Sequence, residues 1–129
     1  MFSVYGGAPV TSQIRSGFIT TTETDLKGYR VMSRMGVVRG ITVRSRSVIG
    51  TFGAKVQQVF GGNISLLTDL CEETRAEAFA LAVQHAEALG ANALVGVRYD
   101  ATEIMSGVSE VLCYGTAMRV VPEREAQTF

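Results

Sequence analysis

The side chains of this sequence best suited to bind a soft metal ion are its two cysteines and its one histidine. They are Cys71, His85 and Cys113, and none lies in the spacing of a Cys-x-x-Cys or zinc-knuckle motif. Cys71 and His85 are fourteen residues apart on an expected helix, about 21 Å at 1.5 Å per residue. One ion therefore cannot bind both within a subunit, and cysteines in such positions are more often buried small apolar residues.

Three arginines and a serine form a second candidate site, for an anion. Arg39, Arg44, Arg46 and Ser47 lie where an expected strand ends and an expected helix begins. Backbone amides and arginine side chains both point toward such a junction, which suits a phosphate or carboxylate group. The alternative is that these arginines pair with acidic residues of a neighbouring subunit.

Enzyme chemistry is not expected. No nucleophile has a visible partner base, and Glu73 and Glu77, one helical turn apart, predict a solvated or intersubunit face rather than a glycosidase pair. Gly50, Gly61 and Gly62 match neither a G-x-G-x-x-G nor a P-loop pattern. No cofactor is expected other than a soft metal ion, should the cysteines or the histidine bind one.

Charge is balanced in total but uneven along the chain, with 12 basic and 12 acidic residues. Every charge between residues 26 and 68 is positive, whereas acidic residues dominate from 69 to 110. One explanation is self-complementary assembly, in which the basic half of one subunit meets the acidic half of its neighbour. The other is a surface for anions or nucleic acid, but the neutral net charge argues against nucleic acid.

Length and composition predict one folded domain in a reducing cytoplasm. The 129 residues are 47% apolar and 19% charged, which excludes a disordered chain and favours extra burial in a subunit interface. No apolar stretch approaches the roughly 20 residues of a membrane span. The first residues also lack the basic start and apolar run of a secretory signal.

Hydrophobic periodicity predicts the element order β-β-α-α-β-β. This order indicates an α+β fold, an antiparallel sheet of about four strands covered by two helices on one face. The chain divides into an N-terminal arm over 1–16, a single domain over 17–121 and a C-terminal tail over 122–129. Strands are expected at 18–22, 29–44, 93–99 and 110–121, and helices at 47–60 and 66–89.

Local patterns add detail to this order. The longer helix carries an apolar stripe that includes Leu67, Cys71, Ala78, Leu81, Ala82, His85 and Leu89, and Gly90 should end it in a left-handed conformation. Alternation in the strand at 93–99 places Ala93, Val95, Val97 and Tyr99 on one side. Interior glycines at 40, 96 and 115 predict a helix seated closely on the sheet.

Several ordered motifs resemble one known family. They are Gly36-Val-Val-Arg-Gly40, Val43-Arg-Ser-Arg-Ser47, Gly61-Gly62, Glu73-Thr-Arg-Ala-Glu77, the run from Ala88 to Val97 (ALGANALVGV), and Tyr114-Gly-Thr-Ala117. Together these motifs, over about Phe18 to Val121, resemble the YbjQ-like or UPF0145 family of small bacterial and archaeal proteins. The resemblance implies a dodecin-like α+β subunit in a ring, a homopentamer, and it carries the label "putative heavy-metal-binding domain".

The family pattern has no motif that requires the cysteines or the histidine, so no metal ligand is carried over from it. A ring could still bring copies of His85 to a shared site. The sequence therefore predicts a non-enzymatic, ring-forming binding or scaffold protein, with a small anionic ligand or a protein as its partner. The alternative is a soft heavy-metal or metalloid binder that uses Cys71, His85 or Cys113.

Overall fold

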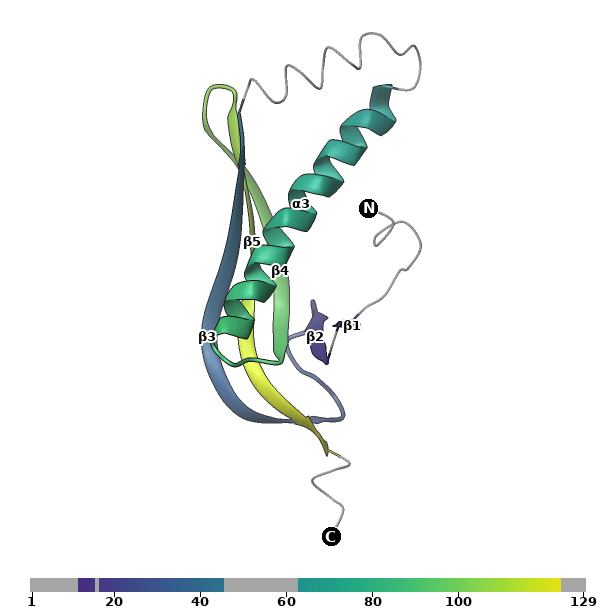
Figure 1. The fold of residues 1–129 in the computed structure, drawn as a ribbon, viewed down its shortest axis with the longest axis vertical. Helices are drawn as coiled ribbons and strands as arrows, with labels where there is room; N and C mark the ends of the chain where they lie inside the picture. Colours follow the sequence, from purple (N-terminus) through teal and green to yellow (C-terminus); the bar gives the residue numbers. More distant parts are fainter. Residues whose placement is uncertain (1–11, 16, 46–62, 124–129) are drawn as a thin grey trace.

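The computed structural model describes residues 12–15, 17–45 and 63–123, which form a sheet crossed by one long helix (Figure 1). The elements in chain order are β1 (Ser12–Arg15), β2 (Phe18–Thr21), β3 (Tyr29–Arg44), α3 (Asn63–Ala88), β4 (Ala93–Met105) and β5 (Val108–Pro122). The α+β class is confirmed. The first expected helix, at 47–60, lies outside the described residues, and β1 falls within the segment predicted to be an N-terminal arm.

The sheet has five strands in the order β1-β2-β4-β5-β3 and is mixed. β2 pairs with β4 in parallel, through Ile19 with Ala93 and Thr20 with Leu94, whereas all other neighbours are antiparallel. The prediction of an antiparallel sheet of about four strands was therefore wrong in two respects. It missed β1, and it did not foresee that β2 pairs with β4 and not with β3, its neighbour in the sequence.

The three long strands form the body of the sheet. β3 runs from Tyr29 to Arg44, as predicted, and pairs along its length with β5. β4 continues to Met105, well past the expected end at Tyr99, because its polar second half still pairs with β5. A turn at Ser106 and Gly107 joins β4 to β5, since Met105 pairs directly with Val108.

The helix contacts the sheet most closely at Gly40. A Cβ atom built on Gly40 would lie 2.1 Å from the carbonyl oxygen of Ala78 and 2.6 Å from the amide nitrogen of Ala82. The predicted close approach at this glycine is therefore confirmed. Gly115 is crowded instead by the neighbouring strand, where its Cβ would lie 2.9 Å from the Val95 carbonyl oxygen.

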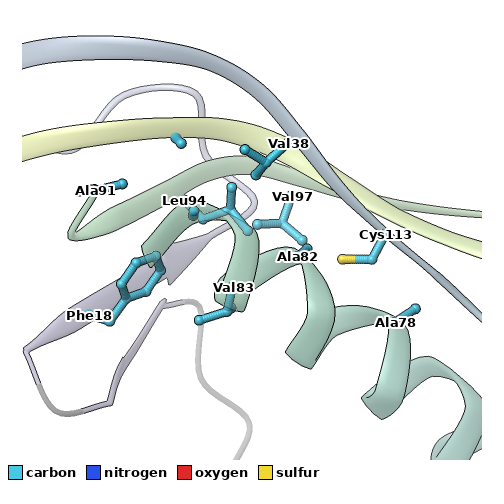
Figure 2. Packing of buried hydrophobic residues seen from close by; sticks show 11 residues of the cluster. Phe18, Val38, Ala78, Ala82, Val83, Ala91, Leu94, Val97 and Cys113 are labelled. Atoms are coloured by element: carbon cyan, nitrogen blue, oxygen red, sulfur yellow. The ribbon is translucent and has the colours of Figure 1, made fainter. Parts of the chain in front are cut away.

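Small side chains, not leucines, form the buried face of α3. Ala78, Ala82 and Ala86 are fully buried against Cys113 and Ala117 of β5 (Figure 2 shows Ala78, Ala82 and Cys113). Of the predicted stripe, Leu67 and Leu89 are about half exposed, and Cys71 and His85 are exposed. The predicted stripe is therefore confirmed at Ala78 and Ala82 and wrong at these four positions. Near Gly40 the helix backbone lies so close to the sheet that the side chains facing it are small.

A bulge in β4 divides its apolar residues between two cores. The pairing register shifts between Val95 and Arg98, and Gly96 has a positive φ of 63° that favours glycine. Ala93 and Val95 consequently pack in one cluster, whereas Val97 packs in the cluster under the helix. The predicted alternation that placed all of them on one side was wrong because the bulge inverts it.

The second cluster lies on the face of the sheet that α3 does not cover. Ile19, Ala93, Val95, Met118 and Val120 form it, and Leu26 from the segment between β2 and β3 packs against it. The two faces of β5 divide between the clusters, since Cys113 and Ala117 belong to the cluster under the helix while Met118 and Val120 belong to this one.

The junction between α3 and β4 is fixed by backbone and side-chain hydrogen bonds. The left-handed conformation predicted for Gly90 is confirmed at φ 91°. The Gly90 amide donates to the Glu87 carbonyl and the Ala91 amide to the Ala86 carbonyl, which is a Schellman pattern. The Asn92 side chain then makes two hydrogen bonds with the backbone of Val120. Its Nδ2 donates to the Val120 carbonyl and its Oδ1 accepts from the Val120 amide. The end of the helix is thereby held to the last strand.

Replacing Gly40 by alanine should strongly destabilise the fold. The new methyl group would overlap backbone atoms of α3, which cannot rotate away, so the helix must lift from the sheet. We expect a loss of about 3 kcal/mol or more in the free energy of unfolding, measured by urea titration followed by circular dichroism.

Thr42, two residues along β3, provides the matched control. It is 7% exposed, and its hydroxyl has no hydrogen-bond partner among the described residues. Thr42→Val keeps the shape and removes this unsatisfied group, so it should be neutral or stabilise the protein by up to about 1 kcal/mol. If both variants lose a similar amount of free energy of unfolding, the close contact between helix and strand at Gly40 is not the cause of the loss.

Candidate functional site

The predicted anion site is not gathered into one cluster by the described structure. Arg39 is exposed between Val38 and Gly40, both buried toward the helix, whereas Arg44 reaches the helix itself. Arg46 and Ser47 lie outside the described residues. The structure therefore separates the two described arginines and leaves the anion site without a shared geometry in this part of the chain.

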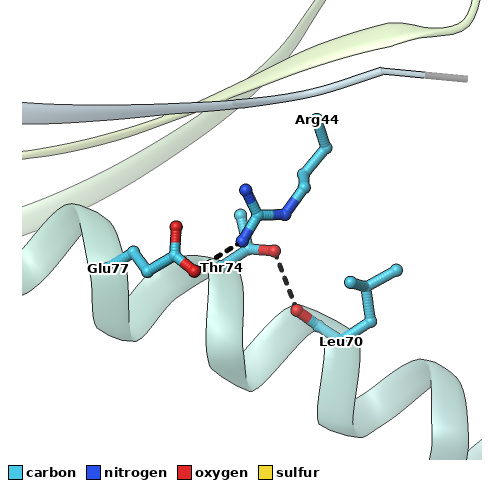
Figure 3. Close-up of polar contacts among 4 residues, drawn as sticks. All are labelled: Arg44, Leu70, Thr74 and Glu77. Atoms are coloured by element: carbon cyan, nitrogen blue, oxygen red, sulfur yellow. Dashed lines mark hydrogen bonds and ion pairs between the residues drawn. The ribbon is translucent and has the colours of Figure 1, made fainter. Parts of the chain in front are cut away.

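Arg44 is paired within its own subunit. Its Nη2 donates to Oε2 of Glu77 at 2.8 Å, and in the next turn of α3 the Thr74 hydroxyl donates to the Leu70 carbonyl at 2.8 Å (Figure 3). The Glu77 side chain is 47% exposed, so the ion pair contributes less than about 1 kcal/mol. Its importance lies in charge matching, because one basic residue of β3 and one acidic residue of α3 neutralise each other.

The three predicted metal ligands also lie apart. Cys71 is exposed on α3, Cys113 is buried beneath the helix, and His85 lies near the exposed end of α3. In residues 12–15, 17–45 and 63–123, no group of three or more histidine, cysteine or acidic side chains is arranged to hold a metal ion. Any metal site that uses these residues must draw ligands from another subunit or from outside the described ranges.

The environment of Cys113 keeps its sulfur protonated. Burial raises the pKa of the Cys113 thiol from 9.0 to about 11, against the smaller lowering effect of a hydrogen bond with Tyr99. The Arg75 guanidinium lies over the Tyr99 ring, 5.4 Å from its centroid. Because the thiolate is the nucleophile and the metal ligand, this position suits packing rather than reactivity.

His85 and Arg39 meet in a groove along the outer edge of β3. Nδ1 of His85 lies 2.6 Å from the Arg39 carbonyl oxygen, which it bonds when that nitrogen carries the proton. The groove has a volume of about 450 Å³ and is lined by Val38, Arg39, Ile41, Leu81, His85 and Leu89. One residue of the anion hypothesis and one of the metal hypothesis thus lie in the same groove.

Sequence reasoning did not find this groove. The sequence feature that could have revealed the groove is the spacing of Leu81, His85 and Leu89 at four-residue steps, which places them on one side of the helix. That spacing was interpreted as a buried stripe. The structure shows instead that the stripe flanks the edge of the sheet.

A second feature of the surface is an apolar strip on the helix-free face of β3. Val37 is 69% exposed, Ile41 42% and Val43 50%, and they alternate with residues that face the helix. The second core cluster covers only the other end of this face, near Tyr29 and Val31. These apolar side chains are therefore exposed on both sides of Arg39, without cover among the described residues.

In the described part of the chain, no helix has the length and apolar character needed to cross a membrane.

Comparisons with known proteins agree with the sequence motifs. A family model described as "Putative heavy-metal-binding" matches residues 18–121. The chain is 63% identical over 102 residues to a UPF0145 protein of Solibacter usitatus, covering 79% of this chain and 91% of the relative. It is 58% identical over 104 residues to a UPF0145 protein of Chromobacterium violaceum, covering 81% and 89%.

A crystal structure of a protein of unknown function from Pediococcus pentosaceus, of the DUF74 family, has a similar fold. The TM-score is 0.53 at 18% sequence identity, over 81% of this chain and 99% of that one. At this identity the similarity establishes the fold alone.

The two cysteines should differ sharply in reactivity. At pH 8 a thiol reagent such as Ellman's reagent should modify exposed Cys71 quickly, and Cys113 only when the protein unfolds. Equal rates in the native protein would contradict the burial of Cys113. The Cys71→Ala variant, which leaves Cys113 as the single thiol, isolates the slow reaction.

Cys113 should also make stability fall in alkali. Because its folded pKa is raised, its contribution is complete below about pH 9 and is lost as pH rises toward 11, by about 2 to 3 kcal/mol in all. Urea titrations at pH 8 and 10.5 measure the loss, and Cys113→Ala should show a smaller one.

Proposed function

This chain belongs to the UPF0145, or YbjQ-like, family, and we propose that it acts as a non-enzymatic binding or scaffold protein that assembles into a ring of identical subunits. The family motifs, the matching family model and the relatives with about 60% identity support the assignment. The ring, its dodecin-like form and its five subunits come from the resemblance, and the surface of the subunit supplies the physical reason for assembly.

The observation that carries this proposal is the apolar strip of Val37, Ile41 and Val43. An isolated subunit would expose these side chains on an edge strand of the described sheet, an arrangement that natural proteins cover or charge. Covering a half-exposed valine or isoleucine contributes about 1 kcal/mol. Because every subunit of a ring presents the same strip, the gain is repeated at each interface.

A binding role fits the described chemistry better than catalysis. The thiol with a raised pKa, Cys113, lies buried under the helix and away from the groove that contains His85. Catalytic groups need both access to substrate and a pKa near the working pH. Arg39 is the residue of the anion hypothesis that lines a groove, so an anionic partner would contact the subunit there.

Soft-metal binding is the second candidate, because the matching family model is described by that activity. Within one subunit Cys71 is exposed, Cys113 is buried and His85 contacts Arg39, so the three do not share a centre. A metal site of this kind would draw further ligands from another subunit or from outside the described residues, and exposed His85 and Cys71 are the accessible members.

Charging the apolar strip should break the assembly. We expect Val37→Asp/Val43→Asp to shift the protein from an oligomer toward a 13.8 kDa monomer in native mass spectrometry, because each new carboxylate would be buried at an interface. Met32→Asp is the matched control, since Met32 is 53% exposed on the same strand but outside the strip. A wild-type monomer would refute the ring, and an unchanged double variant would place the interface elsewhere.

Elemental analysis separates the two candidate functions. Protein purified without chelator should contain no stoichiometric zinc, copper, cadmium or nickel if the protein is a scaffold. If metal is present, Cys71→Ala/Cys113→Ala and His85→Ala tell which residues hold it. If each variant binds less metal in proportion to the number of ligands removed, soft-metal binding is favoured over the scaffold role.

A further inference from the structure

The groove beside β3 is an open site with apolar walls and basic residues. Ile41, Leu81 and Leu89 supply apolar surface, and Leu89 is 53% exposed. Arg39 has no ion-pair or hydrogen-bond partner for its side chain among the described residues. The groove also follows the outer edge of the sheet, since among the described strands β3 pairs only with β5. Its complement would be an apolar segment that carries carboxylates.

The tip of the β4–β5 hairpin has this complementary character. Ile104 is 54% exposed and Met105 64%, the largest exposures of apolar side chains on β4. Glu103 precedes them, with its Oε2 accepting a hydrogen bond from the Gly107 amide, and Glu110 follows on β5. The tip forms one extreme end of the sheet and stands clear of α3 (Figure 1).

A subunit cannot insert this tip into its own groove. Both belong to one continuous sheet, and Arg39 pairs with Tyr114, six residues along β5 from Val108 at the tip. Six residues of extended strand span about 20 Å. The two surfaces of one chain are therefore held apart, and the tip can fill only the groove of another copy.

We propose that the β4–β5 hairpin tip of one subunit docks in the β3–α3 groove of the next, with Ile104 and Met105 against the leucines and Glu103 near Arg39. The charge division of the sequence supports this partner, because the groove arginine comes from the basic stretch and the tip from the acidic one. The contact joins two different surfaces, so it is heterologous and can be repeated from subunit to subunit. It rests on the proposed ring and specifies how its subunits meet.

The test uses two variants that each damage one side of the contact. The groove variant is Arg39→Glu/Leu89→Asp and the tip variant is Ile104→Asp/Met105→Asp. Each alone should run as a 13.8 kDa monomer in native mass spectrometry. Mixed in equal amounts, they retain one intact groove and one intact tip, so they should form a 1:1 heterodimer and no larger species.

A matched control carries the same new charges elsewhere. Met32→Asp/Leu67→Asp alters residues that are 53% and 44% exposed, away from the groove and the tip, and should keep the wild-type mass. If a double variant does not fold, the single variants Arg39→Glu and Met105→Asp serve for the same mixing test.

The outcomes distinguish this proposal from the ring itself. A wild-type monomer would overturn both. A wild-type oligomer that either variant preserves, or a mixture that stays monomeric while the wild type assembles, would leave the ring in place and overturn the tip-in-groove contact.

Discussion

The subunit depends on the close contact between Gly40 in β3 and the backbone of α3. At this point a methyl group on the strand would overlap the carbonyl of Ala78, so the absence of a side chain sets the distance between helix and sheet. The cluster under the helix combines alanines of α3 and Cys113 and Ala117 of β5 with larger side chains such as Phe18 and Leu94. Small side chains at the point of closest approach let helix and sheet pack densely there.

This constraint also determines the surface of the molecule. With Ala78 and Ala82 turned toward the sheet, Leu81 and Leu89 lie at the flank of the helix, where they form a groove with the edge of β3. Arg44 and Glu77 meet above the strand as the helix passes over its end. The groove and the ion pair are thus consequences of the position that the helix takes on the sheet.

The sequence predicted the elements better than their surroundings. The bounds of β3, the helix stop at Gly90 and the close approach at Gly40 were predicted because each depends on a local residue type. The parallel pairing of β2 with β4 and the inversion at Gly96 depend on distant partners and on one backbone angle, which no periodicity reveals. The candidate sites were predicted least well. Proximity in sequence suggested that Arg39 and Arg44 act together, whereas alternation along the strand separates them.

The pairing of β2 with β4 has a consequence for how the chain folds. Only two residue pairs define its register, and Ile19 and Ala93 are separated by most of the domain, yet Phe18 packs in the cluster under the helix and Ile19 in the other. Contacts between distant residues require a large loop-closure entropy, whereas α3, β4 and β5 meet through nearby ones. We therefore expect the C-terminal half to form a folding nucleus that β2 joins late, sealing both cores in one step.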